Sequence, residues 1–431
     1  MTTKKKHQKN SHKKTIKHSK SKIPTIPPTL YKKYNELSPF ELKDKLLTMA
    51  SAGHREMYNA GRGNPNFFNV FVREVFAKLQ VLVMHITDSK KHLLHDLDVY
   101  PGKNEFDYDK LFRKGVKSWK KKEREFFLDY MKLIKDESKK QHLNYNDMLH
   151  DVLLSTIGCF YPVPPQIQPH LNLFTQKFMY QLVMGDNPDP EEEGAKLKPE
   201  DFEFFATEGA AAGILYVFNT LKENFLLKEG DSIAIITPIF SPYLEMPRLA
   251  DYDLKIVELK GNPEQNYALD DSEINKLRDK KIKGLFMVNP SNPGAYSLPK
   301  ENIDKIGNLI NKERPDIFVL SDSVYAPFAR KYNSFMLSCP KNTIEVYSLS
   351  KYFGTTGWRL GLVMLPKKTN LDKMIADLPS GEKKKLHKRY SLASIDPEKL
   401  SFMTRLVFDS RQVAEAHVGG LSTPQQVLIG L

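Results

Sequence analysis

The sequence of 431 residues has only two cysteines, Cys159 and Cys339. They are too few for a disulfide framework and too far apart for a metal or redox pair, so we predict a cytoplasmic protein without a metal site. No apolar run reaches the roughly 18 residues that a membrane helix needs, and no apolar stretch follows the basic N-terminus as a signal peptide requires. The sequence therefore predicts a protein with no membrane partner.

Acidic residues are absent from the first 22 positions, which hold nine lysines. The whole chain has 65 lysines and arginines against 52 acids, so the remaining 56 bases nearly cancel the acids and most of the net charge of +13 belongs to this tail. With so few apolar residues the tail is predicted to be disordered, and a proline-broken linker extends it to residue 28. Binding to nucleic acid is the alternative, but we favour a solvated extension and expect no nucleic-acid partner.

The rest of the chain has apolar content enough for two domains. Residues 29–158 are predicted to form an N-terminal arm and a helical region. A helix begins at Ser38-Pro39, and helical spacing continues from about Asn69 to Leu154 with an interruption near Pro101. Residues 159–366 are assigned to a large cofactor-binding domain, and residues 367–431 to the start of an incomplete C-terminal region belonging to a smaller domain.

Seven short apolar runs alternate with helical stretches in the large domain, at 202–206, 232–237, 254–259, 284–288, 317–322, 344–348 and 360–365. This alternation predicts an α/β fold with a mainly parallel sheet between helices, whose ligands lie at the carboxyl ends of the strands. After Pro366 the sequence is polar and lysine-rich to about Lys399, and then helical to about Val418. The final apolar stretch, VLIGL, predicts no clear element.

The segment SLSKYFGTTGWRLG, residues 348–361, follows a strand and carries Lys351 with Arg359 eight positions later. It resembles the lysine motif of class I and II aminotransferases, which are fold-type I enzymes dependent on pyridoxal 5'-phosphate (PLP). The resemblance implies that Lys351 forms a Schiff base with PLP and that Arg359 and Ser348 bind its phosphate. Desolvation or neighbouring positive charge makes an amine nucleophilic, and a guanidinium can grip phosphate bidentately. Taken alone, an S-x-x-K sequence would more often indicate a lysine in a surface loop than a cofactor site.

Two further motifs follow strands in the order that this family requires. In VLSDSVYAPF the resemblance implies that Asp322 pairs with the pyridine nitrogen and that Tyr325 hydrogen-bonds the ring oxygen. In MVNPSNPGAY, Asn292 matches the asparagine that binds the same oxygen. Taken alone, an aspartate at a strand end is more often a cap, and Asn-Pro-Gly is more often a turn.

A third motif, FEFFATEGAAAGILYVFNTL, predicts a strand, a turn at Gly209-Ala210-Ala211 and a helix whose N-terminus could receive a phosphate. Phe240, in TPIFSPY, stands where the family places an aromatic ring on the face of the cofactor. Tight helix packing and a core phenylalanine are the alternatives at these two places. Together the four motifs cover roughly residues 160–365.

Within this family the sequence is most similar to the bifunctional aspartate aminotransferases and L-aspartate 4-decarboxylases, through LSPFELKDKL, NAGRGNPNF, GCFYPVP, ATEGAAAG and TPIFSPYLEMP. The resemblance implies that Arg62, and more weakly Lys43, face the side-chain carboxylate of aspartate. It also implies that Tyr161 reaches the cofactor phosphate of a neighbouring subunit, in a homodimer or a multiple of dimers. A structural arginine in a Gly-rich turn is the alternative for Arg62.

The implied substrates are aspartate and a 2-oxo acid. Hydrolysis after proton removal from Cα would give oxaloacetate, whereas loss of the β-carboxylate would give alanine and CO2. The sequence departs from the family at Gly209-Ala210-Ala211, where Gly-Gly-Thr is expected, and it offers no arginine for the α-carboxylate. The alternative is therefore a catalytically inactive, truncated remnant that acts as a binding or scaffold protein.

Overall fold

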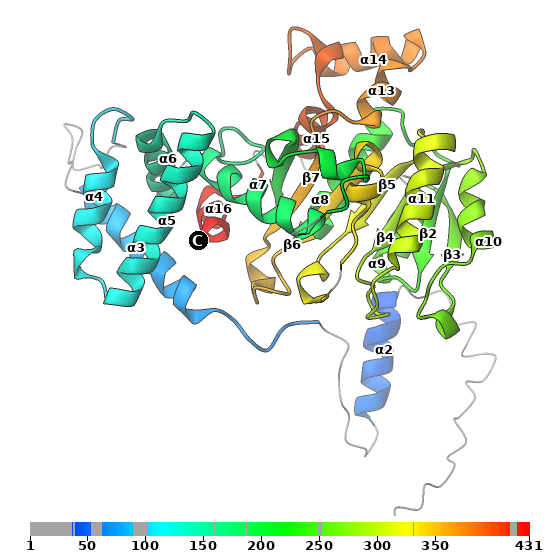
Figure 1. Cartoon of the computed structure of the whole chain (residues 1–431), viewed down its shortest axis with the longest axis horizontal. Helices are drawn as coiled ribbons and strands as arrows, with labels where there is room; N and C mark the ends of the chain where they lie inside the picture. Colours follow the sequence, from blue (N-terminus) through cyan, green and yellow to red (C-terminus); the bar gives the residue numbers. More distant parts are fainter. Residues whose placement is uncertain are drawn as a thin grey trace, which may run out of the picture. The chain divides into compact units, whose positions relative to one another are not determined.

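The computed structural model describes residues 37, 39–52, 63–88, 101–158, 160–185, 188–248, 252–330, 332–413 and 420–431 (Figure 1). Met1–Gly61 and Arg62–Leu431 form two compact units, and each is described by itself. In the first unit α2 spans Pro39–Ser51 and begins at the predicted Ser-Pro start. The tail and linker predicted at residues 1–28 lie outside the described residues. Among the described helices, none combines the length and apolar character needed to cross a membrane.

The second unit begins with helices, of which all but the last lie in the stretch that the sequence predicts to be helical. Their bounds are Val70–Asp88 (α3), Tyr108–Gly115 (α4), Lys121–Lys140 (α5), Tyr145–Ile157 (α6) and Pro169–Met184 (α7). Local sequence sets several ends. Asn144 caps α6 by accepting a hydrogen bond from the Asp147 amide, and Gly158 ends it in the left-handed conformation, where glycine is unstrained. The apolar faces of these helices share one core, so the helical prediction is confirmed where residues are described.

All seven predicted strands are present within about two residues of their predicted bounds. They span Phe202–Thr207 (β1), Ser232–Thr237 (β2), Lys255–Lys260 (β3), Ile282–Val288 (β4), Phe318–Asp322 (β5), Thr343–Ser348 (β6) and Gly361–Pro366 (β7). They form one sheet in the order β1-β7-β6-β5-β4-β2-β3. Of these seven strands, only β7 runs in the opposite direction to the others, which confirms a mainly parallel sheet.

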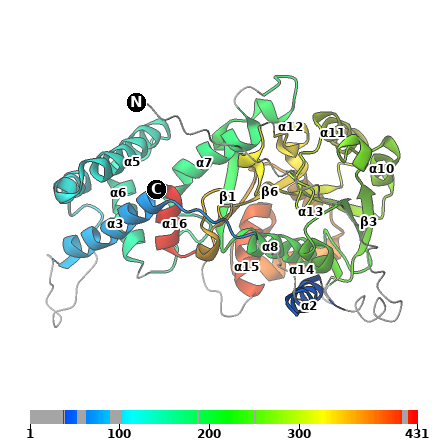
Figure 2. The same cartoon turned by 90° about the horizontal axis from the view of Figure 1, so that it is seen from below.

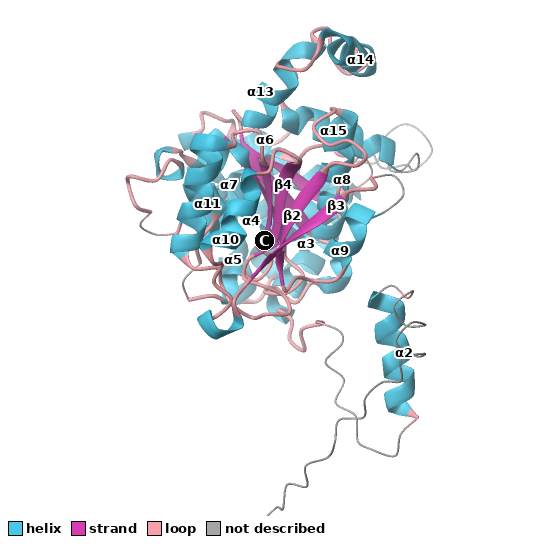
Figure 3. Cartoon of the chain, turned by 90° about the vertical axis from the view of Figure 1, so that its right-hand side faces the viewer, coloured by secondary structure: helices cyan, strands magenta, loops and turns pink. Residues whose placement is uncertain are grey.

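Helices cover both faces of the sheet, as Figure 3 shows by placing the strands between them. These helices are α8 (Ala210–Glu223), α9 (Pro242–Glu245), α10 (Asp271–Asn275), α11 (Lys300–Glu313) and α12 (Phe335–Ser338). Side chains alternate along a strand. On β1, Phe205 therefore packs into the core that includes α8, and Phe204 into the core of the N-terminal helices.

The C-terminal region contains more regular structure than the sequence predicts. Two helices, α13 (Asn370–Ala376) and α14 (Ser380–Tyr390), lie in the polar stretch before Lys399. Helix α15 (Phe402–Val413) lies beside α8 (Figure 2), and residues 414–419 are outside the described part. The final apolar stretch, for which no element was predicted, forms α16 (Thr423–Gly430), because its apolar side chains pack against the N-terminal helices.

Candidate functional site

The predicted site residues follow strands that end at one edge of the sheet. Asn292 follows β4, Asp322 ends β5 and Lys351 follows β6. Strand β1 runs in the same direction as β6, because both are antiparallel to β7 between them, so Gly209 also follows a strand at this edge. Parallel strand ends converge on a common edge, where ligands of α/β proteins bind.

Lys351 is partly buried, and its Nζ donates a hydrogen bond of 2.7 Å to the carbonyl oxygen of Gly63. Burial lowers the pKa of the Lys351 ammonium, and the Arg359 guanidinium lowers it further, while the Asp322 carboxylate opposes them. A Cβ placed on Gly63 would lie 3.1 Å from Lys351 Nζ and 3.9 Å from the Tyr325 hydroxyl. The amine therefore lies in a confined place, and it loses its proton more readily than a fully solvated lysine does.

Asp322 is buried, with 4% of its surface exposed. Its Oδ1 accepts a hydrogen bond of 2.9 Å from the Val324 amide, and its Oδ2 accepts one from the Tyr243 hydroxyl. Burial raises the pKa of Asp322 to about 6, although these two hydrogen bonds and Lys351 pull it down. A buried carboxylate of this kind can hold a proton on a basic ring nitrogen.

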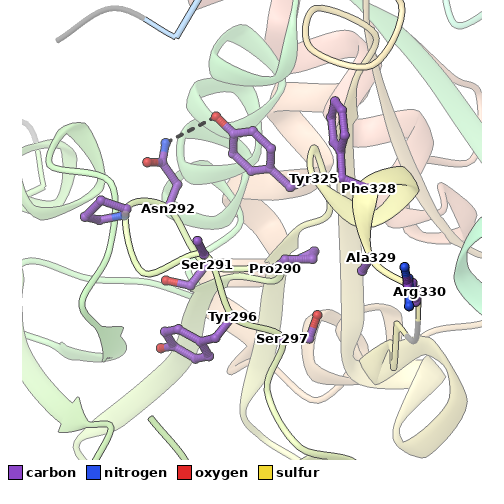
Figure 4. Close-up of a pocket in the computed structure, with 11 residues that line it drawn as sticks. Pro290, Ser291, Asn292, Tyr296, Ser297, Tyr325, Phe328, Ala329 and Arg330 are labelled. Atoms are coloured by element: carbon purple, nitrogen blue, oxygen red, sulfur yellow. Dashed lines mark hydrogen bonds between the residues drawn. The ribbon is translucent and has the colours of Figure 1, made fainter. Parts of the chain in front are cut away.

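Asn292 and Tyr325 face each other across the site. The Asn292 side-chain amide donates a hydrogen bond of 3.5 Å to the Tyr325 hydroxyl, as Figure 4 shows. Both residues line a cavity of about 470 Å³ that extends to Phe328 and Arg330. These two polar groups point together and could both contact one oxygen of a ligand.

Gly209 and Arg359 meet at the N-terminus of α8. Gly209 has a φ of +93°, and a Cβ placed there would lie 2.4 Å from Arg359 Nη2. Arg359 Nη2 also donates a hydrogen bond of 3.3 Å to the Glu208 carbonyl oxygen. The first amides of α8, from Ala210 and Ala211, precede the point where helical hydrogen bonding begins. Together with the guanidinium they make an environment suited to phosphate.

The other predicted cofactor contacts, Ser348, Phe240 and Tyr161, lie in different surroundings. The buried Ser348 hydroxyl donates to the Leu360 carbonyl oxygen at 3.4 Å and accepts from the Ser350 amide at 3.2 Å. The Phe240 ring is 39% exposed and packs edge-on against Tyr243 at 5.6 Å between centroids. Tyr161 is 70% exposed, so its side chain has few contacts within its own chain.

Arg62 lies outside the described residues, and Lys43 lies in α2 of the first unit. Their assignment to the substrate's carboxylate stays a prediction.

The sequence reasoning missed Tyr243 and Gly63. Tyr243 is three residues after Phe240 in the same motif, one helical turn further on, and that spacing could have indicated that both face the site. Gly63 lies within the same NAGRGNPNF motif as Arg62. Gly63 contributes its backbone carbonyl oxygen. Every residue has this group, so the residue type does not indicate the contact.

Comparison with known proteins shows the family of the chain. The sequence profile of the family described as aminotransferase class I and II matches residues 180–427. The chain therefore belongs to the class I and II aminotransferases, and its α/β sheet has their fold, known as fold type I. Enzymes of this family depend on PLP.

Individual relatives have more specific names than the family. Over 406 residues the chain is 38% identical to a bifunctional aspartate aminotransferase and L-aspartate β-decarboxylase from a Pseudomonas species, spanning 92% of this chain and 73% of that protein. It is 32% identical over 163 residues to the aspartate aminotransferase of Pyrococcus horikoshii, spanning 37% of this chain and 39% of that protein. The structure of Bna3p from Saccharomyces cerevisiae shares the fold, with a TM-score of 0.52 and 16% identity over 94% of this chain and 69% of that one.

The residues present fit PLP. Its phosphate matches the N-terminus of α8 beside Arg359, where Gly209 leaves no room for a side chain. Its ring nitrogen matches the buried Asp322 carboxyl, and its ring oxygen matches the Asn292 and Tyr325 pair. The chemistry of these donors and acceptors is complementary to every polar end of the cofactor.

Proposed function

We propose that this chain uses PLP to transaminate L-aspartate, to remove its β-carboxylate, or both. The observation that carries the proposal is the grouping of an amine with a lowered pKa, Lys351, with the buried Asp322 carboxyl and the Arg359 guanidinium. Aspartate is favoured as substrate because the 38% identical relative acts on it by name. The products would be oxaloacetate, with the amino group passed to a 2-oxo acid, or alanine and CO2.

PLP, when bound, supplies a ring that withdraws electrons from the Cα of the attached amino acid. Asp322 would hold the proton on the ring nitrogen, with Tyr243 fixing the orientation of the carboxyl. Arg359 and the first amides of α8 would hold the phosphate, while Asn292 and Tyr325 bind the ring oxygen. The Lys351 amine would take the Cα proton, since its neutral form is favoured by burial and by Arg359.

Nothing favours the alternative of an inactive remnant. Three of the groups on which the chemistry depends, Lys351, Asp322 and Arg359, interact electrostatically within one site. A scaffold has no physical need for a destabilised ammonium beside a buried carboxyl, because each costs folding free energy.

The test is to add PLP, L-aspartate and a 2-oxo acid as amino-group acceptor to the purified chain, and to measure alanine, CO2 and oxaloacetate. We expect product from the wild type and a loss of roughly a hundred- to ten-thousandfold in Lys351→Ala. Lys388→Ala, at an exposed position of α14, is the matched control and should keep full activity. Borohydride reduction followed by mass spectrometry should locate the cofactor on Lys351, and attachment to another lysine would refute the assignment.

We also propose a cytoplasmic homodimer, or a multiple of dimers, in which Tyr161 of one subunit reaches the cofactor phosphate of the other. Three exposed aromatic side chains support a subunit contact. Tyr161 is 70% exposed, Phe328 53% and Tyr352, next to Lys351, 45%. The low cysteine content supports the location, and Cys339 is buried as a free thiol.

A further inference from the structure

The segment from Gly63 to Phe76, which leads into α3, packs along the loop that carries Lys351. At its start, the Gly63 carbonyl accepts the hydrogen bond from Lys351 Nζ. At its end, the Phe76 ring packs edge-on against Trp358, with 6.2 Å between centroids. The two stretches are nearly 300 positions apart in sequence, so only the tertiary structure brings them together.

Arg73 makes the central contact between them. Its Nη2 donates a hydrogen bond of 2.7 Å to the carbonyl oxygen of Gly354. The same guanidinium lies over the Phe68 ring, with Cζ 4.7 Å from the centroid. Arg73 is partly buried, so this contact is less screened by water than a surface pair would be.

Gly354 closes the turn that begins at Lys351. Its amide donates a hydrogen bond of 3.3 Å to the Lys351 carbonyl oxygen, and its φ is +62°. A Cβ at Gly354 would lie 2.3 Å from the Phe67 carbonyl oxygen, so the turn is pressed against the Gly63–Phe76 segment. The hydrogen bond from Arg73 therefore stabilises this turn on the side where the turn contacts the Gly63–Phe76 segment.

We infer that Arg73 is a positioning residue for Lys351: by tying the Gly354 carbonyl to α3 it keeps the lysine's turn packed, and so keeps water away from the amine. The inference adds to the proposed function a residue that touches neither cofactor nor substrate. The Arg359 guanidinium and the Asp322 carboxylate act on the charge of the Lys351 amine, and the Gly63 carbonyl accepts its hydrogen bond. The distance of the amine from each of these groups depends on where this turn lies.

The first measurement uses the cofactor-free chain, so that it does not depend on the proposed activity. The rate at which an amine-acylating reagent labels Lys351 is followed against pH by mass spectrometry. Burial is the main cause of the lowered pKa of Lys351, so Arg73→Met should move the midpoint of labelling to higher pH as water enters. Arg73→Lys, which keeps a donor for the Gly354 carbonyl, should restore most of the wild-type midpoint.

Repeating the labelling at high salt distinguishes the loss of the Arg73 hydrogen bond from the loss of its charge. At about 1 M salt the screening length is roughly 3 Å, so an effect of the Arg73 charge alone would weaken. We expect the difference between Arg73→Met and the wild type to persist. Arg113→Ala is the matched control, because Arg113 is a half-exposed arginine paired with Asp109 in α4, and it should leave the midpoint unchanged.

The second measurement is turnover of the PLP-loaded chain, in which Arg73→Met should lower kcat about tenfold while KM changes less than about twofold. A lower melting temperature with an unchanged labelling midpoint would show a merely structural role and overturn the inference, as would a shift that disappears in salt. If the wild type bound no PLP, the proposed function would fail, yet the labelling experiment would still decide the role of Arg73.

Discussion

Burial acts in opposite directions on the two titratable residues at the centre of the site. It raises the pKa of Asp322 to about 6 and lowers the pKa of Lys351, because in each case it disfavours the charged form. Such shifts in one place are typical of a site that performs chemistry. They also mean that the site reduces the stability of the cofactor-free fold.

At the residue scale, the substitution Asp322→Asn tests whether the buried carboxyl reduces the stability of the cofactor-free fold. The folded pKa of about 6 exceeds the ordinary 3.8, so the folded state favours the protonated carboxyl. That advantage is fully present below about pH 4 and is lost as the pH rises through 6. Cofactor-free Asp322→Asn should therefore unfold like the wild type near pH 4 and be more stable above pH 6, by up to roughly 3 kcal/mol.

Chemical denaturation at a series of pH values measures the difference. Asp316→Asn provides a control of opposite sign, because the Arg314 guanidinium lowers the pKa of Asp316. That variant should lose stability at neutral pH, and the loss should fade as the pH falls through the folded pKa. If both variants respond to pH alike, our account of Asp322 is wrong. With PLP and aspartate added, Asp322→Asn should also turn over poorly, since a neutral amide cannot hold the ring nitrogen protonated.

At the scale of elements, the turn between β1 and α8 determines whether a phosphate can approach. Gly209 has a backbone conformation that glycine adopts without strain, and its Cα faces the Arg359 guanidinium. Because Gly209 has no side chain, space remains beside the Arg359 guanidinium in which a phosphate oxygen could bind.

Gly209→Ala should weaken PLP binding by about tenfold or more, because its Cβ would displace Arg359. Gly230→Ala is a matched control, since Gly230 also has a positive φ, +81°, but no atom would lie within 4 Å of its Cβ. Both variants should lose stability from backbone strain, on the order of 1–3 kcal/mol, and Gly209→Ala should lose more because its φ of +93° and ψ of 163° are essentially restricted to glycine. Equilibrium titration with PLP measures the affinity, and equal affinities in the two variants would count against the phosphate site.

At the scale of the whole molecule, a site completed by a neighbouring subunit links cofactor binding to assembly. If Tyr161 reaches the partner's phosphate site, PLP binds the dimer more tightly than the monomer. PLP must then shift the equilibrium toward the dimer. The exposure of Tyr161 is what motivates this expectation.

Sedimentation of the dilute chain, with and without PLP, tests the linkage. We expect PLP to raise the dimer fraction in the wild type, and Tyr161→Phe to reduce that shift because the phosphate loses one hydrogen-bond donor. Tyr145→Phe is a suitable control, since the Tyr145 hydroxyl donates to Asp109 at 2.8 Å within the N-terminal helices. A dimer fraction that ignores PLP in the wild type would remove the basis for a shared site.

The sequence by itself determined the strands, most of the helices and the order of the motifs, because these follow from short-range periodicity and from residue types at fixed spacing. It did not indicate α16, which is stabilised by packing against distant helices. Tyr243, Gly63 and Arg73 reach the site from other segments, through one hydroxyl, one backbone carbonyl and one guanidinium. Only the tertiary structure could decide these contacts, and the protonation of Asp322 and Lys351, because burial is a property of the packed chain and not of the residue.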